Sequence, residues 1–209
     1  MKNSLLLSIV LASAANFGQA AGAVESVAGI AVPADVRQLA QAAVGTRDNQ
    51  GLAFAVVDKK SARVFIYGDN GRLQGASPVL LGLARGDESV PGVGERKMSD
   101  IRPEERTTPA GRFVSEPGIN LQGEDIVWVD YDAAVSMHRV RTNNRAERRL
   151  ERLASTDAEE HRISYGCINV PAPFYDIHVK PVFGKARGLI YVLPEGRPAR
   201  EYFKFLPTD

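Results

Sequence analysis

The segment around Cys167, the only cysteine in the chain, has the residue types of a nucleophilic site. A thiol attacks a carbonyl as its thiolate, so Cys167 needs a base or a positive field that lowers its pKa. Gly166 places no side chain beside the sulfur, so a substrate carbonyl could approach and backbone N–H groups could face a developing oxyanion. The competing interpretation is a small buried apolar residue, which is what most free cysteines are.

Three histidines are available as the base for this thiol: His138, His161 and His178. His138 ends an expected strand, and a rigid element would aim its side chain. His161 lies in a charged run and is expected on the solvated surface, whereas His178 is expected to pack under a late helix. Spacing alone does not choose among them. The HxxxH or HxH spacing that would favour a zinc site is absent from the sequence, so no metal is expected.

The elements that must position these residues are mostly strands. Runs rich in β-branched and aromatic residues predict strands at 52–58, 62–68, 126–132, 134–140 and 188–194. Helices are expected at 33–44, within 143–161 and at 173–179. Residues 84–111 form a long Gly/Pro-rich connection, and loops of this length are usually functional or mobile. The pattern predicts a mainly β (α+β) domain over 51–209, preceded by an N-terminal arm and short helix over 21–50.

Composition narrows the class of protein. The 209 residues carry 26 Lys+Arg against 25 Asp+Glu, and this balance argues against a nucleic-acid binder, which shows a basic excess or patch. A hydrophobic content of 44% is ordinary for a globular chain. A single cysteine excludes an internal disulfide framework and any CxxC motif.

The first twenty residues have the three parts of a secretory signal peptide. Lys2 precedes an apolar run over 5–15, and small residues follow at Gly18 and Ala20, so cleavage is expected after Ala20. The apolar run has about 11 residues, whereas a membrane-spanning helix needs about 20. We therefore expect a secreted or periplasmic protein associated with the cell wall.

Three ordered segments resemble the L,D-transpeptidase catalytic domain, the YkuD-like family of peptidoglycan-modifying cysteine enzymes. The β-rich stretch over 56–82 is similar to the start of that domain, and Thr108–Phe113 (TPAGRF) is similar to its TPxGxF turn. His138, followed by the segment Ser164–Asn169 (SYGCIN), resembles its signature of a histidine and a later glycine–cysteine pair. The resemblance implies an L,D-transpeptidase-like β-sandwich with a few short helices.

The same resemblance implies roles for six residues. Cys167 matches the nucleophile and His138 the general base and acid. Ser164, Tyr165 and Gly166 match the segment that binds substrate and the oxyanion, and Asn169 matches a position that shapes the site. The expected reaction forms 3→3 cross-links between peptidoglycan stem peptides through a thioester, without a cofactor. Carbapenems are expected to acylate the cysteine.

The sequence departs from the family pattern at two points. Tyr165 stands where the family usually has histidine, and His138 and Cys167 are 29 residues apart, which is more than usual and indicates an insertion over about 142–162. Ala146, Leu150 and Leu153 would share one face of a helix capped by Asn143 or Asn144. That helix is interpreted either as a solvated surface element or as a lid over the site.

Several alternatives stay open at this stage. The acyl-enzyme could be resolved by a stem amine, by the lysine of an envelope lipoprotein or by water, the last giving a carboxypeptidase or amidase. A non-catalytic wall-binding protein would keep the fold without turnover, and intact Cys167 and His138 argue against it. A papain-like peptidase would place its cysteine before its histidine, which is the reverse of the order here.

Overall fold

The computed structural model describes residues 29–207. The predicted signal peptide over 1–20 and most of the predicted arm lie outside the described residues. Within 29–207, no helix has the length and apolar character that a membrane span requires.

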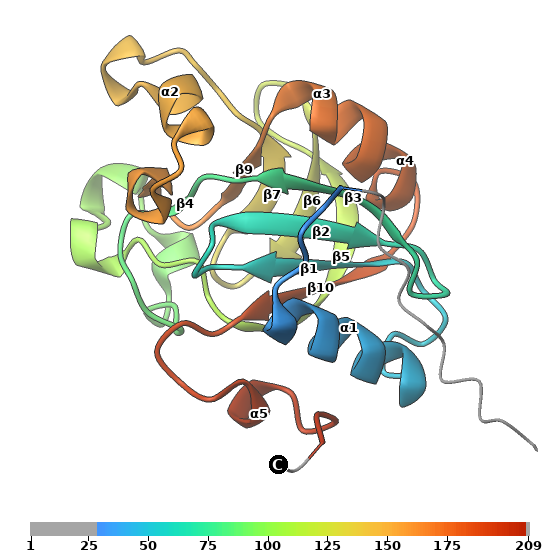
Figure 1. The fold of residues 1–209 in the computed structure, drawn as a ribbon. Helices are drawn as coiled ribbons and strands as arrows, with labels where there is room; N and C mark the ends of the chain where they lie inside the picture. The colour runs from blue at the N-terminus through green and yellow to red at the C-terminus, as the bar shows by residue number, and fades with distance from the viewer. Residues whose placement is uncertain (1–28, 208–209) are drawn as a thin grey trace, which may run out of the picture.

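Eight strands form one strongly curved sheet in the order β3-β2-β1-β10-β5-β6-β7-β9 (Figure 1). Neighbours pair antiparallel except β1 with β10 and β7 with β9, which are parallel. A second, two-stranded parallel sheet pairs β4 with β8. The strands are β1 (Phe54–Asp58), β2 (Arg63–Tyr67), β3 (Leu73–Pro78), β4 (Leu81–Gly82), β5 (Gly111–Ile119), β6 (Asp125–Asp130), β7 (Val135–Arg139), β8 (Arg162–Ser164), β9 (Ile168–Val170) and β10 (Gly188–Leu193).

The helices are short and lie at the periphery of the sheet. Figure 1 shows α1 and α5 on one side, α3 and α4 on the other, and α2 projecting from one end. Their bounds are α1 (Ala34–Gly45), α2 (Arg149–Ala154), α3 (Ala172–Phe174), the π-helical turn η6 (Tyr175–Val179), α4 (Lys180–Phe183) and α5 (Ala199–Tyr202). Five 3-10 turns complete the set: η1 (Val93–Glu95), η2 (Met98–Asp100), η3 (Pro103–Glu105), η4 (Arg145–Glu147) and η5 (Ala158–His161).

Alternating residues of the central strands build two separate cores. Ala55 and Val57 of β1 point into a cluster that is closed on its far side by β6, β7, β9 and the α3–α4 helices. Phe54 and Val56 point the other way, into a cluster covered by α1 and the C-terminal segment. Because side chains alternate across a strand, β1 is buried on both faces. The predicted mainly β class with a few short helices is confirmed.

The insertion differs from the single helix that was predicted. Asn144 caps a turn as expected, since its side-chain oxygen accepts from the Ala146 N–H. Arg148 then adopts a left-handed conformation (φ 49°), which ends η4 and begins α2 in a new direction. Ala146 therefore no longer shares a face with Leu150 and Leu153, which both lie on α2. Ala146 is exposed and Leu150 is 59% exposed, so of the three only Leu153 is buried. The predicted apolar docking face is wrong for this reason.

Candidate active site

Strand pairing brings His138 and Cys167 together although they are 29 residues apart in the sequence. In the parallel β7–β9 pair, His138 is the Cα partner of Asn169, and Cys167 immediately precedes β9. Ser136 and His138 are two residues apart on β7 and so share a face of the sheet. Their neighbour Met137 points the other way, into the core.

The sulfur of Cys167 is half-buried among polar groups. Its Sγ lies 3.7 Å from the Ser136 hydroxyl and 3.7 Å from the Ala134 carbonyl oxygen. Burial raises the pKa of this thiol. The hydrogen bond to His138, the His138 charge and the hydrogen bonds from Ser136 outweigh burial, so the pKa of Cys167 lies below its ordinary value.

A contact with the backbone determines which ring nitrogen of His138 carries the hydrogen. Nδ1 lies 2.8 Å from the Arg139 carbonyl oxygen. A carbonyl only accepts, so Nδ1 carries the hydrogen and Nε2 of the neutral ring keeps its lone pair. Nε2 is therefore the nitrogen that can take the proton of the Cys167 thiol.

Gly166 has a conformation and a packing environment that require glycine. Its φ is +128°, and a Cβ at this position would lie 2.9 Å from the Thr107 carbonyl oxygen. The Thr108 hydroxyl donates to the Gly166 carbonyl at 2.7 Å and accepts from the Gly82 N–H at 2.8 Å. The TPAGRF turn thus contacts the cysteine loop directly.

Two side chains hold the carbonyl of Cys167. Ser164 Oγ donates to it at 2.7 Å, and Asn169 Nδ2 donates at 3.1 Å. Ser164 Oγ also accepts the Gly166 N–H at 3.1 Å. An oxyanion would have to compete with Ser164 for the Gly166 N–H. The other backbone N–H groups of this segment that could donate to an oxyanion are those of Tyr165 and Cys167.

Cys167 opens into a cavity of about 230 Å³. The cavity lies between the cysteine loop, the end of β7, the 84–111 connection and the insertion. Its walls are formed by Met98, His138, Arg141, Asn143, Asn144, Glu147, Arg149, Ser164, Tyr165, Cys167 and Asn169. All the predicted site residues except the buried Gly166 therefore line one cavity. Their catalytic roles remain predictions.

Tyr165, which departs from the family pattern, is held by a cation–π contact. The Arg106 guanidinium lies 3.9 Å from the centroid of its ring. Arg106 in turn donates to the Ile101 carbonyl through Nε and Nη2, at 3.2 and 3.0 Å. The 84–111 connection thus fixes the tyrosine ring that forms one wall of the cavity.

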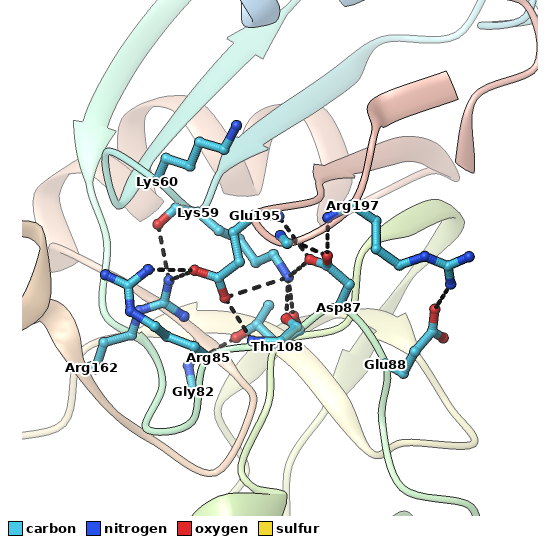
Figure 2. Close-up of polar contacts among 12 residues, drawn as sticks. Lys59, Lys60, Gly82, Arg85, Asp87, Glu88, Thr108, Arg162, Glu195 and Arg197 are labelled. Carbon is cyan, nitrogen blue, oxygen red and sulfur yellow. Dashed lines mark hydrogen bonds and ion pairs between the residues drawn. The ribbon is translucent and has the colours of Figure 1, made fainter. Parts of the chain in front are cut away.

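A buried ionic cluster anchors this connection to the sheet, as Figure 2 shows. Lys59 Nζ, fully buried, donates to the Gly86 and Thr108 carbonyls at 2.5 and 3.0 Å and pairs with Asp87 at 2.8 Å. Glu195 lies 3.9 Å from Lys59 Nζ and pairs with Arg162 at 2.5 Å. The buried members of the cluster are two cations and two carboxylates, and the exposed Arg85 also pairs with Glu195 at 3.4 Å. The Lys59 contact with the Thr108 carbonyl fixes Thr108, which contacts Gly166.

The other two histidines lie outside the cavity. The surface position predicted for His161 is wrong: the residue is 3% exposed, with Nδ1 2.9 Å from the Val79 carbonyl and Nε2 3.1 Å from the Ser155 carbonyl. Both nitrogens are occupied because His161, at the end of η5, lies between the link from β3 to β4 and the residue that follows α2. His178 packs against Phe174, with ring centroids 4.8 Å apart. Of the three histidines, only His138 is in position to serve as the base.

Sequence reasoning missed Ser136 and Arg149 as site residues. Ser136 could have been found from its position two residues before His138 on one strand, which places both side chains on one face. Arg149 had no comparable signal, because its place in the cavity depends on the break at Arg148. Within residues 29–207, no three or more His, Cys, Asp and Glu side chains gather as a metal site would require.

Comparison with known proteins adds distant structural likenesses. No family model matches the chain, and no curated protein matches it in sequence. Similar solved structures include a variant of the Enterococcus faecium L,D-transpeptidase, which is 18% identical with a TM-score of 0.37, over 68% of this chain and 49% of that one. The helical cell shape determining protein Pgp2 from Campylobacter jejuni is 14% identical with a TM-score of 0.45, over 70% and 49%. An L,D-transpeptidase from Mycobacterium smegmatis is 18% identical with a TM-score of 0.37, over 67% and 58%.

The chain thus spans about half the length of the first two of these proteins. At such identities and TM-scores the likeness carries no argument about activity. The function is therefore argued from the residues and contacts of this chain.

Proposed function

We propose that this protein is a cysteine acyltransferase of the L,D-transpeptidase type that acts on peptidoglycan stem peptides. The observation that carries the proposal is the arrangement at the base of the cavity. A half-buried thiol with a lowered pKa meets Ser136 and a histidine whose Nδ1 hydrogen is already engaged. This is the arrangement of an activated nucleophile: a thiol, an adjacent base and a contact that orients the base.

The chemistry follows from these positions. His138 Nε2 takes the thiol proton, and the sulfur attacks the carbonyl between the third stem residue and the terminal D-Ala. Backbone N–H groups of the cysteine loop stabilise the oxyanion. The C–N bond then breaks, the D-Ala amine leaves with the proton from His138, and a thioester remains on Cys167. An acceptor amine attacks the thioester and forms the new amide, and Cys167 regains its proton.

The acceptor decides the biological outcome. A stem amine would give a 3→3 cross-link, which we propose as the main reaction. Water would give a carboxypeptidase or amidase, and a lipoprotein lysine would give protein anchoring. We further propose that the protein works outside the cytoplasm, at the cell wall, because this substrate is located there and residues 1–20 have the pattern of a signal peptide.

Muropeptide analysis tests the proposal. The protein, expressed without residues 1–20, is incubated with tetrapeptide-rich sacculi beside a Cys167→Ala control. New 3→3 dimers that are absent from the control are expected. Tripeptides without dimers would identify a hydrolase, and unchanged muropeptides together with no carbapenem adduct on the wild type would contradict an acyltransferase.

A further inference from the structure

One arginine of the insertion reaches the residues that hold the nucleophile. Arg149 is the first residue of α2, which Figure 1 shows projecting from the end of the sheet. Its side chain is nevertheless only 14% exposed, because it turns back toward β9. Nη1 donates to Asn169 Oδ1 at 2.6 Å, and Nε donates to Glu147 Oε2 at 2.5 Å.

This contact defines the orientation of the Asn169 amide. Arginine has donors only, so the Asn169 atom that faces it must be the oxygen. The amide nitrogen is thereby directed at the Cys167 carbonyl, 3.1 Å away. Asn169 is 1% exposed, so water cannot replace a lost partner easily. A reversed amide would set oxygen against oxygen at the Cys167 carbonyl.

We propose that Arg149 is a positioning residue for acylation of Cys167, acting through Asn169 on the carbonyl of the nucleophile. The inference rests on the proposed function, since acylation is the step it concerns. The chain of contacts runs from Glu147 through Arg149 and Asn169 to Cys167, so the insertion is a structural part of the site. Arg149 also lines the cavity. The alternative is that Arg149 binds substrate directly, and the experiment must distinguish this role from positioning of the nucleophile.

The matched comparison is Arg149→Met against Arg148→Met. Arg148 is the adjacent residue, is exposed and pairs with Glu151 inside the insertion. Acylation by imipenem is followed by intact-mass spectrometry over a range of concentrations. Arg149→Met should lower the maximal acylation rate about 10- to 100-fold, because small misplacements of a nucleophile are costly, and should leave the half-saturating concentration within about threefold. Arg148→Met should match the wild type, and Arg149→Lys should restore part of the rate because an ammonium still donates to Asn169.

A second variant keeps the inference testable if Arg149→Met folds poorly. Asn169→Leu, which has a similar volume, neither accepts from Arg149 nor donates to the Cys167 carbonyl. It should lose acylation rate to a similar degree. The double variant Arg149→Met/Asn169→Leu should be no slower than the slower of the two single variants, because both changes break one chain of contacts and neither places a charge at the buried position 169. The pH midpoint of iodoacetamide alkylation should stay at the wild-type value in Arg149→Met, since His138 is untouched.

Three results would overturn the inference: equal rates in Arg149→Met and Arg148→Met, a raised half-saturating concentration with an unchanged maximal rate, or additive losses in the double variant. A wild type that imipenem does not acylate would contradict the proposed function instead. In that case the contact between Arg149 and Asn169 is tested by the NMR signals of the Asn169 side-chain amide. They should move in Arg149→Met and stay in place in Arg148→Met, and identical spectra would overturn the inference as well.

Discussion

At the residue scale, the surroundings of the sulfur separate Cys167 from an ordinary buried cysteine. An inert cysteine lies among apolar side chains, which raise its pKa. Cys167 instead lies between the hydroxyl of Ser136, the carbonyl of Ala134 and the ring of His138, and the pKa of the thiol falls. The His138 ring is itself oriented by its contact with the Arg139 carbonyl.

The first prediction concerns the titration of this thiol. Because the pKa of Cys167 is lowered, its thiolate persists at lower pH, and the midpoint of iodoacetamide alkylation should lie below the usual value of about 8.5. His138→Ala removes the main lowering contact and should move the midpoint back up. His178→Ala, which alters a histidine outside the cavity, should leave it unchanged. Rates that are equal at every pH in the wild type and His138→Ala would exclude the pairing of Cys167 with His138.

At the element scale, the cysteine loop takes its shape from segments that are remote in the sequence. The 84–111 connection contributes Thr108, whose hydroxyl binds the Gly166 carbonyl, and it is anchored by the buried Lys59. The insertion contributes Arg149 from the opposite side. The long connection also supplies Met98 to the cavity and Arg106 to Tyr165, and its functional character stays a prediction.

The adjacent residues Lys59 and Lys60 allow a matched test of whether Lys59 anchors the 84–111 connection. Burial lowers the pKa of Lys59, whereas its hydrogen bond and ion pair with Asp87 act in the other direction. Lys59→Met would leave two buried carboxylates short of a cation, and we expect a loss of about 3–5 kcal/mol in the free energy of unfolding. Lys60→Met removes only an exposed lysine, 4.0 Å from Asp35, and should change that free energy by less than about 1 kcal/mol.

Urea denaturation of both variants measures the difference. The carbapenem acylation rate of the folded Lys59→Met protein should also fall, because the Thr108 carbonyl loses its contact with Lys59. Equal stability of the two variants would show that the buried cluster does not hold the connection.

At the scale of the whole molecule, carboxylates held by basic partners link stability to pH. Hydrogen bonds from the Arg102 side chain and backbone lower the pKa of Glu105 from 4.5 to about 2 and outweigh the opposing effect of burial. The pKa of Asp87 is also lowered: burial raises it, and Lys59 together with the N–H groups of Glu195 and Gly196 outweighs burial. In both groups the folded pKa lies below the unfolded value. Their stabilisation is therefore present above about pH 4.5 and is lost as the pH falls toward 2.

The third prediction follows from this linkage. The free energy of unfolding of the wild type should decrease between pH 5 and pH 2.5, as measured by urea denaturation at intervals of about half a unit. Glu105→Gln should be less stable than the wild type at pH 5 and should show a shallower decrease. Glu104→Gln alters an adjacent carboxylate with a 64% exposed side chain and should follow the wild-type curve. Parallel curves for Glu105→Gln and the wild type would contradict the assignment of Glu105.

The sequence by itself determined the class of fold, the positions of the main strands and a small set of candidate residues. A run rich in β-branched and aromatic residues is a local signal, so β1, β2, β6, β7 and β10 could be predicted from short windows. Cys167 and Gly166 could be singled out because a single cysteine beside a glycine can be recognised in the sequence without knowledge of tertiary contacts. The sequence left three histidines open as the base.

Only the tertiary structure decided which of these residues meet. The parallel pairing of β7 with β9 joins segments across the whole insertion and brings His138 to Cys167. His161 is buried elsewhere, against the Val79 and Ser155 carbonyls. The left-handed residue Arg148 redirects α2 so that Leu150 faces solvent and Arg149 reaches Asn169. These outcomes depend on the packing of remote segments against one another, and the free energy of such packing is not contained in any local window of the sequence.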